Sequence, residues 1–172
     1  MRISREFLLL IVAILIGIVV LFSGINTRSS IEQGAVNYED QCTKLAASRL
    51  DKPFQLEHVP VNEIETDAAI FACSQALDAD PSSNRLKFYL GRSYESVKTI
   101  ESLRQAKKIY LELSESGYAP AFYFLYRLGL VYKQLAMSTD EKHMYLKSAA
   151  DMGLPSAVNE YISVIGAADH FY

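Results

Sequence analysis

The chain has 172 residues, half of them apolar, and a formal net charge of -3 at pH 7. This length accommodates one membrane segment and one modest domain, since domains usually take ~100–150 residues. The slightly acidic balance, with no polybasic run, excludes a general nucleic-acid binder, because such proteins normally present a basic face.

The N-terminal segment is the most apolar part of the chain. Residues 7–27, after a short tail of residues 1–6, carry no charge, and residues 7–22 are apolar apart from Gly17. A helix of ~20 apolar residues spans the ~30 Å hydrocarbon core of a bilayer. The pattern therefore predicts a transmembrane helix that acts as an uncleaved signal anchor. Two alternatives stay open: a cleaved signal peptide, for which the run offers no Ala-x-Ala-like site, and a buried core helix.

The basic residues near the ends of this segment set its expected orientation. Arg2 and Arg5 precede it, whereas Arg28 follows it. By the positive-inside rule this difference slightly favours an N-terminus on the cytoplasmic side. We expect a single-pass protein of a bacterial-type inner membrane, with the N-terminus cytoplasmic and the domain periplasmic. Residues 28–36 form a short polar linker that reaches at most ~35 Å, so a partner should lie in or close to the membrane.

Residues 37–66 are expected to hold one helix and a loop. Apolar residues recur at helical spacing from Asn37 to Leu50. No helical period occurs between residues 51 and 62, where Pro53 and Pro60 indicate a long loop. Thr66 or Asp67 is then placed to cap the following helix.

Cys42 and Cys73 are the only cysteines in the chain. In an oxidising compartment such a pair is expected to form a disulfide, which would staple the two helices across the proline-containing loop. A disulfide that closes a loop of about 30 residues raises the free energy of unfolding by on the order of 3 kcal/mol. The alternative is a pair of buried thiols. No metal site is expected, because the three histidines are scattered and no Cys-x-x-Cys pattern occurs.

Two motifs recur in the second half of the chain. Leu-Gly-Arg-Ser-Tyr from Leu90 returns as Leu-Gly-Leu-Val-Tyr from Leu128, at an offset of 38 positions. Glu-Ser-Gly-Tyr-Ala-Pro-Ala from Glu115 returns as Asp-Met-Gly-Leu-Pro-Ser-Ala from Asp151, at an offset of 36 positions. A period in this range indicates a stacked helical array. The two-residue difference is expected in the loop between paired helices.

These motifs resemble the Sel-one-like repeat, a relative of the tetratricopeptide repeat, and the Asp80-Pro81 junction matches the latter family. The resemblance covers residues 67–166, which a tail of residues 167–172 follows. It implies an all-α fold in which the transmembrane helix precedes a short right-handed α-solenoid of helix-turn-helix repeats. Residues 95–103 depart from the pattern because they lack a glycine-centred turn, so the first unit is expected to be irregular or to have longer helices.

The four glycines of the repeated motifs have two expected roles. Gly91 and Gly129 are expected to allow close approach of paired helices. Gly117 and Gly153 are expected to end helices through left-handed caps.

Aromatic residues crowd the first helices of the two units, which in arrays of this type line the concave surface. Tyr and Phe there offer large contact area at low entropic cost. Tyr89, Tyr123 and Tyr126 are the better candidates for exposure, and Arg92 and Arg127 are possible polar anchors. We therefore expect these five residues to bind a partner; the alternative is that most of the aromatic side chains belong to the core.

No catalytic motif was found, and neither a cofactor nor a small-molecule substrate is expected. The favoured interpretation is a non-catalytic, membrane-anchored interaction module, adaptor or accessory subunit that binds a membrane or envelope protein through its repeat surface. One alternative is an accessory subunit whose transmembrane helix makes the main contact. A less favoured alternative is a thiol-dependent enzyme of unrecognised type, using Cys42 or Cys73.

Overall fold

The computed structural model describes residues 36–51 and 57–169, and the regular structure of these residues is entirely helical. Residues from Asn37 onward form one compact unit. Its α-helices are α2 (Tyr38–Ala46), α3 (Thr66–Ala79), α4 (Asn84–Val97), α5 (Ile100–Glu115), α6 (Ala119–Val131), α7 (Thr139–Asp151) and α8 (Pro155–Asp169). Two 3-10 turns, η2 (Val61–Glu63) and η3 (Lys133–Leu135), lie between them.

None of the helices in the described residues is long and apolar enough to cross a membrane. The transmembrane helix predicted over residues 7–27 and the linker predicted over residues 28–36 lie outside them, apart from Val36.

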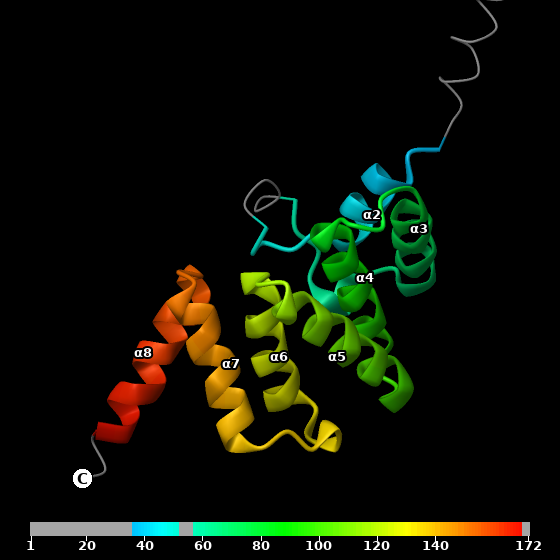
Figure 1. Cartoon of the computed structure of the whole chain (residues 1–172). Helices are drawn as coiled ribbons and strands as arrows, with labels where there is room; N and C mark the ends of the chain where they lie inside the picture. Colours follow the sequence, from blue (N-terminus) through cyan, green and yellow to red (C-terminus); the bar gives the residue numbers. More distant parts are fainter. Residues whose placement is uncertain (1–35, 52–56, 170–172) are drawn as a thin grey trace, which may run out of the picture. The chain divides into compact units, whose positions relative to one another are not determined.

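The helices from α2 to α8 pack mainly on their neighbours in sequence (Figure 1). Each consecutive pair is in contact, and α2 also reaches α4. This is an all-α arrangement compatible with a helical repeat. The largest fully buried aromatic side chains, Tyr89, Tyr110 and Phe88, lie at its centre on α4 and α5.

The disulfide pairing of the two cysteines is confirmed. The sulfur atoms of Cys42 in α2 and Cys73 in α3 lie 2.03 Å apart, and both residues are fully buried. This bond links the two helices on either side of the long loop, as expected. It also leaves neither sulfur as a free thiolate, which argues against the thiol-enzyme alternative.

Two details of this region differ from the sequence-based expectation. Asn37 caps α2, since its side chain accepts a hydrogen bond from the Asp40 amide, but the helix ends at Ala46 and does not reach Leu50. At the start of α3 there is no side-chain cap. The Thr66 hydroxyl instead contacts the hydroxyl of Ser96 in α4 at 2.8 Å, because a tertiary partner competes successfully for it.

The recurring Leu-Gly motifs mark places where paired helices come close together. A Cβ atom built on Gly91 would lie 2.6 Å from Cε1 of Tyr110, across the α4–α5 contact. One built on Gly129 would lie 3.0 Å from Cγ of Lys142, across the α6–α7 contact. The expected role of both glycines is therefore confirmed.

The second pair of glycines ends α5 and α7. Gly117 and Gly153 have φ angles of 75° and 76°. In each cap the glycine N–H donates to the carbonyl oxygen three residues earlier. The N–H of the next residue donates to the carbonyl oxygen five residues before it, as in a Schellman motif. Ala121 and Ala157, four residues after each glycine, are fully buried where the next helix packs.

The missing glycine turn between α4 and α5 has a simple replacement. Lys98 itself adopts the left-handed conformation, with φ of 62°, and α5 starts two residues later. The first unit also has the longer helices, 14 and 16 residues against 13 and 13 in α6 and α7. From the repeated leucine to the end of the second helix, the first unit has seven more α-helical residues than the second and five fewer connecting residues. The two-residue difference in offset therefore arises from helix length, and the expectation that it lies in the loop is wrong.

Alanine substitution is expected to have different effects on stability at the two helix-contact glycines, Gly91 and Gly129. Gly91→Ala should destabilise the protein by about 1–3 kcal/mol, because Tyr110 is fully buried and cannot move away. Gly129→Ala should change stability by less than about 0.5 kcal/mol, since the Lys142 side chain is flexible and alanine favours the helix. Urea denaturation of both variants checks this, and equal losses would contradict it.

Candidate functional site

A cavity of about 630 Å³ opens between the segment after α2, the middle of α4 and α6, and the start of α8. Its lining mixes charged, aromatic and aliphatic side chains and includes Ser156 at the start of α8. Its charged lining residues include Arg49, Arg92, Glu95, Lys98 and Arg127, and its aromatic and aliphatic ones include Leu50, Val61, Tyr123, Phe124 and Val131. We call this cavity the α4–α6 pocket.

Arg92 forms one wall of the pocket and holds the segment after α2 in place. Its guanidinium donates hydrogen bonds to the carbonyl oxygens of Ala46, Ala47 and Val59, and its Cζ lies 5.7 Å from the Phe124 ring centre. The residue is only 3% exposed. Arginine suits this position because its planar fork presents several donors at fixed angles. These hydrogen bonds attach the end of α2 and the residue before Pro60 to α4.

Glu95 lies one helical turn after Arg92 and is also buried. The Tyr110 hydroxyl of α5 donates to its Oε2 at 3.0 Å. Burial raises the pKa of Glu95 to about 7, although the Tyr110 hydrogen bond and the Arg92 and Arg127 charges oppose this shift. The pocket therefore contains a carboxyl group that changes charge near neutral pH.

This carboxyl group predicts a pH dependence of stability. The unfolded chain has the ordinary Glu pKa of 4.5 and the folded chain about 7, so between these values the folded state binds more protons. The contribution of Glu95 to the free energy of unfolding is therefore largest below pH 4.5. It falls by about 2–3 kcal/mol as the pH rises through 7. Glu95→Gln should remove this loss. Urea denaturation of both proteins at pH 5 and pH 8 checks it; identical pH profiles would contradict it.

Two tyrosines of α6 connect this helix to α8. The Tyr123 and Tyr126 hydroxyls donate to the two carboxylate oxygens of Glu160, at 2.7 Å and 3.0 Å. Burial raises the pKa of Tyr123, as does the bond to Glu160, while Arg127 opposes the shift. Tyr123 also lines the pocket, so this small network sets the position of one pocket wall.

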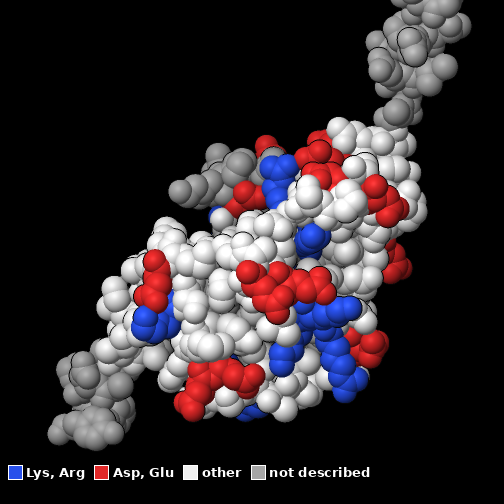
Figure 2. Space-filling model, viewed as in Figure 1, with Lys and Arg blue, Asp and Glu red and all other residues white. Residues whose placement is uncertain are grey.

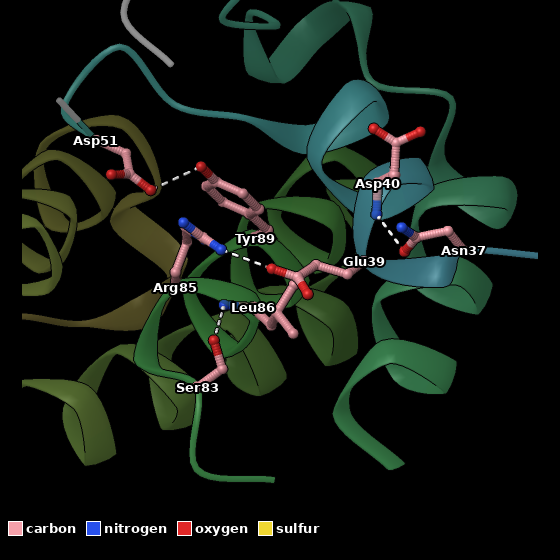
Figure 3. Close-up of polar contacts among 8 residues, drawn as sticks. All are labelled: Asn37, Glu39, Asp40, Asp51, Ser83, Arg85, Leu86 and Tyr89. Carbon is pink, nitrogen blue, oxygen red and sulfur yellow. Dashed lines mark hydrogen bonds and ion pairs between the residues drawn. The ribbon is translucent and has the colours of Figure 1, made fainter. Parts of the chain in front are cut away.

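Tyr89 has a different position from the one expected. It is fully buried, and its hydroxyl donates to Asp51 at 2.7 Å, next to the contact of 2.7 Å between Arg85 and Glu39 (Figure 3). Burial raises the pKa of Tyr89, and Asp51 adds to this effect. Both contacts join α4 to α2 and the segment after it. Tyr89 is therefore part of the structural support beside the pocket.

The expected exposure of the three tyrosines is wrong. Tyr89, Tyr123 and Tyr126 are 0%, 8% and 4% exposed, because the phenol rings fill the spaces between helices and the hydroxyls find carboxylate partners. Of the five residues expected to bind a partner, the structure brings Arg92, Tyr123 and Arg127 together around the pocket. Only Arg127 among the five is exposed.

Sequence reasoning did not find Glu95, Lys98, Phe124 or the contribution of residues 48–50 and 58–62. The spacing of Arg92 and Glu95 was a usable signal, because opposite charges three residues apart on the same helix face can pair. Lys98 and the loop gave no comparable signal, since their place at the pocket depends on the packing of distant segments.

The pocket differs in charge from the face of the protein drawn in Figure 2, on which basic and acidic side chains lie next to one another. The pocket lining instead contains Arg49, Arg92, Lys98 and Arg127 against the single carboxylate of Glu95.

No protein-family model matches the chain, and no curated protein and no solved structure matches it either.

Proposed function

We propose that this protein is a non-catalytic, membrane-anchored interaction module that holds a partner protein at the membrane. In this proposal residues 7–27 anchor the chain in a bacterial-type inner membrane, and the helices from α3 onward form a short Sel-one-like array on the periplasmic side. The partner binds at the α4–α6 pocket.

The pocket is the observation that carries this proposal. Most of its lining comes from α4, from α6 and from residues 48–50 and 58–62, so a single site is assembled from separate parts of the chain. Pockets of several hundred Å³ with an apolar base and a few polar groups are the usual sites of recognition. Arg92 and the Glu160 network fix the pocket walls before any partner arrives, which reduces the entropic cost of binding.

The disulfide supports the proposed compartment. A pair such as Cys42–Cys73 persists in oxidising environments such as the periplasm and is rare in the bacterial cytosol. The same orientation follows from the arginines that flank residues 7–27.

Affinity purification of the full chain in mild detergent tests the proposal. Reversing the charge of two exposed pocket residues, with Arg49→Glu and Arg127→Glu, should abolish recovery of a specific partner that the native chain retains. The matched control is Arg104→Glu on α5, whose side chain is 63% exposed and lies outside the pocket. Equal loss in the control, or full retention in the double variant, would refute the pocket as the partner site.

Deletion of residues 1–27 distinguishes the leading proposal from an accessory subunit that acts through its transmembrane helix. If the pocket binds the partner, the truncated chain should still recover it from detergent extracts. Loss of the partner on truncation, with retention in the pocket variants, would instead assign the main contact to the helix.

A further inference from the structure

The charge of the α4–α6 pocket is opposite in sign to that of the whole chain. Four cationic side chains, Arg49, Arg92, Lys98 and Arg127, line it, whereas the chain has a formal charge of -3. Among the described residues, Glu95 is the one carboxylate in the lining, and because its pKa is about 7 much of its charge is absent at neutral pH. A site of this kind attracts anionic groups and repels cationic ones.

One buried donor in the pocket wall has no partner. The Nε–H of Arg92 makes no hydrogen bond with the described residues, although both terminal nitrogens of the same guanidinium do. Buried donors are normally satisfied. Because this nitrogen has almost no accessible surface, the Arg92 guanidinium contributes positive charge to the pocket wall and no direct contact with a ligand.

Part of the lining is apolar. Leu50, Val61, Phe124 and Val131 contribute aliphatic and aromatic surface between the charged groups. A ligand that consisted only of a small anion would leave this surface uncovered. The lining therefore suits a chain in which carboxylates and apolar side chains alternate.

We propose that the α4–α6 pocket binds an acidic peptide segment of the partner protein, with its carboxylates against Arg49, Lys98 and Arg127 and an apolar side chain against Leu50 and Phe124. The inference rests on the proposed function and specifies the chemistry that the site recognises. Three exposed cations surround a pocket whose walls are already fixed, so the segment meets a largely preformed site.

Binding of a defined probe to the full chain in non-ionic detergent tests the proposal. The probe is a fluorescein-labelled octapeptide of alternating Glu and Leu, and its affinity is measured by fluorescence anisotropy. We expect saturable binding that weakens several-fold when NaCl rises from about 50 mM to 200 mM, because ion pairs at the pocket mouth are screened. An otherwise identical peptide of Gln and Leu should bind at least about tenfold more weakly.

Two substitutions remove pocket charge without threatening the fold. Lys98→Gly places glycine at a left-handed position that favours it, and Arg127→Gln changes an exposed helix residue. Each should weaken binding of the acidic octapeptide about three- to tenfold. The matched controls are Ala136→Gly, at the other left-handed non-glycine position, and Arg104→Gln on α5; both should leave binding unchanged.

The outcomes separate this inference from the proposed function. Equal binding of the acidic and the neutral peptide, or equal effects of pocket and control variants, overturns the acidic-segment proposal. If the partner is still lost from Arg49→Glu/Arg127→Glu in affinity purification, the proposed function survives that failure. Comparing free-acid and amidated forms of the peptide shows whether a terminal or a side-chain carboxylate is bound. Pocket-dependent binding of dihexanoyl phosphatidylglycerol without peptide binding would assign the site to a lipid headgroup and overturn the proposal.

Discussion

Replacing Arg92 with methionine is expected to lower the free energy of unfolding by about 3–5 kcal/mol. Methionine has a similar length, but it donates no hydrogen bond, so the carbonyl oxygens of Ala46, Ala47 and Val59 would lose their shared donor. Glu95 would also lose the cation that, of Arg92 and Arg127, lowers its pKa more. Urea denaturation followed by circular dichroism measures the loss.

Two further variants make this result interpretable. Arg92→Lys keeps the charge but offers one ammonium group in place of a planar fork, so we expect an intermediate loss. Arg104→Met on α5 should change stability by less than about 0.5 kcal/mol, because that side chain is 63% exposed and forms only a surface ion pair. A loss of similar size in the Arg92→Met and Arg104→Met variants would contradict the structural role of Arg92.

Reduction of the Cys42–Cys73 disulfide is expected to lower the free energy of unfolding by about 3–4 kcal/mol. The two residues are 31 positions apart, and the bond restricts the unfolded chain by closing this loop. The denaturation midpoint of the full chain should therefore fall when dithiothreitol is added, and non-reducing electrophoresis should show a faster-migrating band that slows on reduction.

The Cys42→Ser/Cys73→Ser variant is the control for this prediction. Its midpoint should be low and should no longer respond to dithiothreitol. An unchanged midpoint of the native chain after complete reduction would contradict a stabilising role for the bond.

Local chemistry was enough to predict much of the helical part of the fold. Gly117 and Gly153 end α5 and α7 in left-handed caps, as expected from the repeated motifs, and the helix expected to begin near Asn37 does so. These signals depend on backbone dihedral angles and on hydrogen bonds within a few residues, so the sequence alone could reveal them. The helix-contact role of Gly91 was predictable for a related reason, since the same motif recurs at Gly129.

Long-range packing decided which polar and aromatic residues are accessible. Helical spacing placed Tyr89, Tyr123 and Tyr126 on faces that were expected to be open, but carboxylates from distant segments meet all three hydroxyls. A helical period shows which residues share a face, but it does not show what covers that face. For the same reason the candidate site was predicted only in part, because Lys98 and residues 48–50 and 58–62 reach it through tertiary packing.

By itself, the sequence determined the all-helical class of the described residues, the left-handed glycine caps, the pairing of the two cysteines and the close-contact glycines. Only the tertiary structure decided that Arg92 and Glu95 lie buried on one turn of α4 and that a cationic pocket forms beside them. The first group of features depends on contacts within a few residues or, for the two cysteines, on there being only one possible pairing. The second depends on how segments up to 46 positions apart pack together, and no local pattern encodes that arrangement.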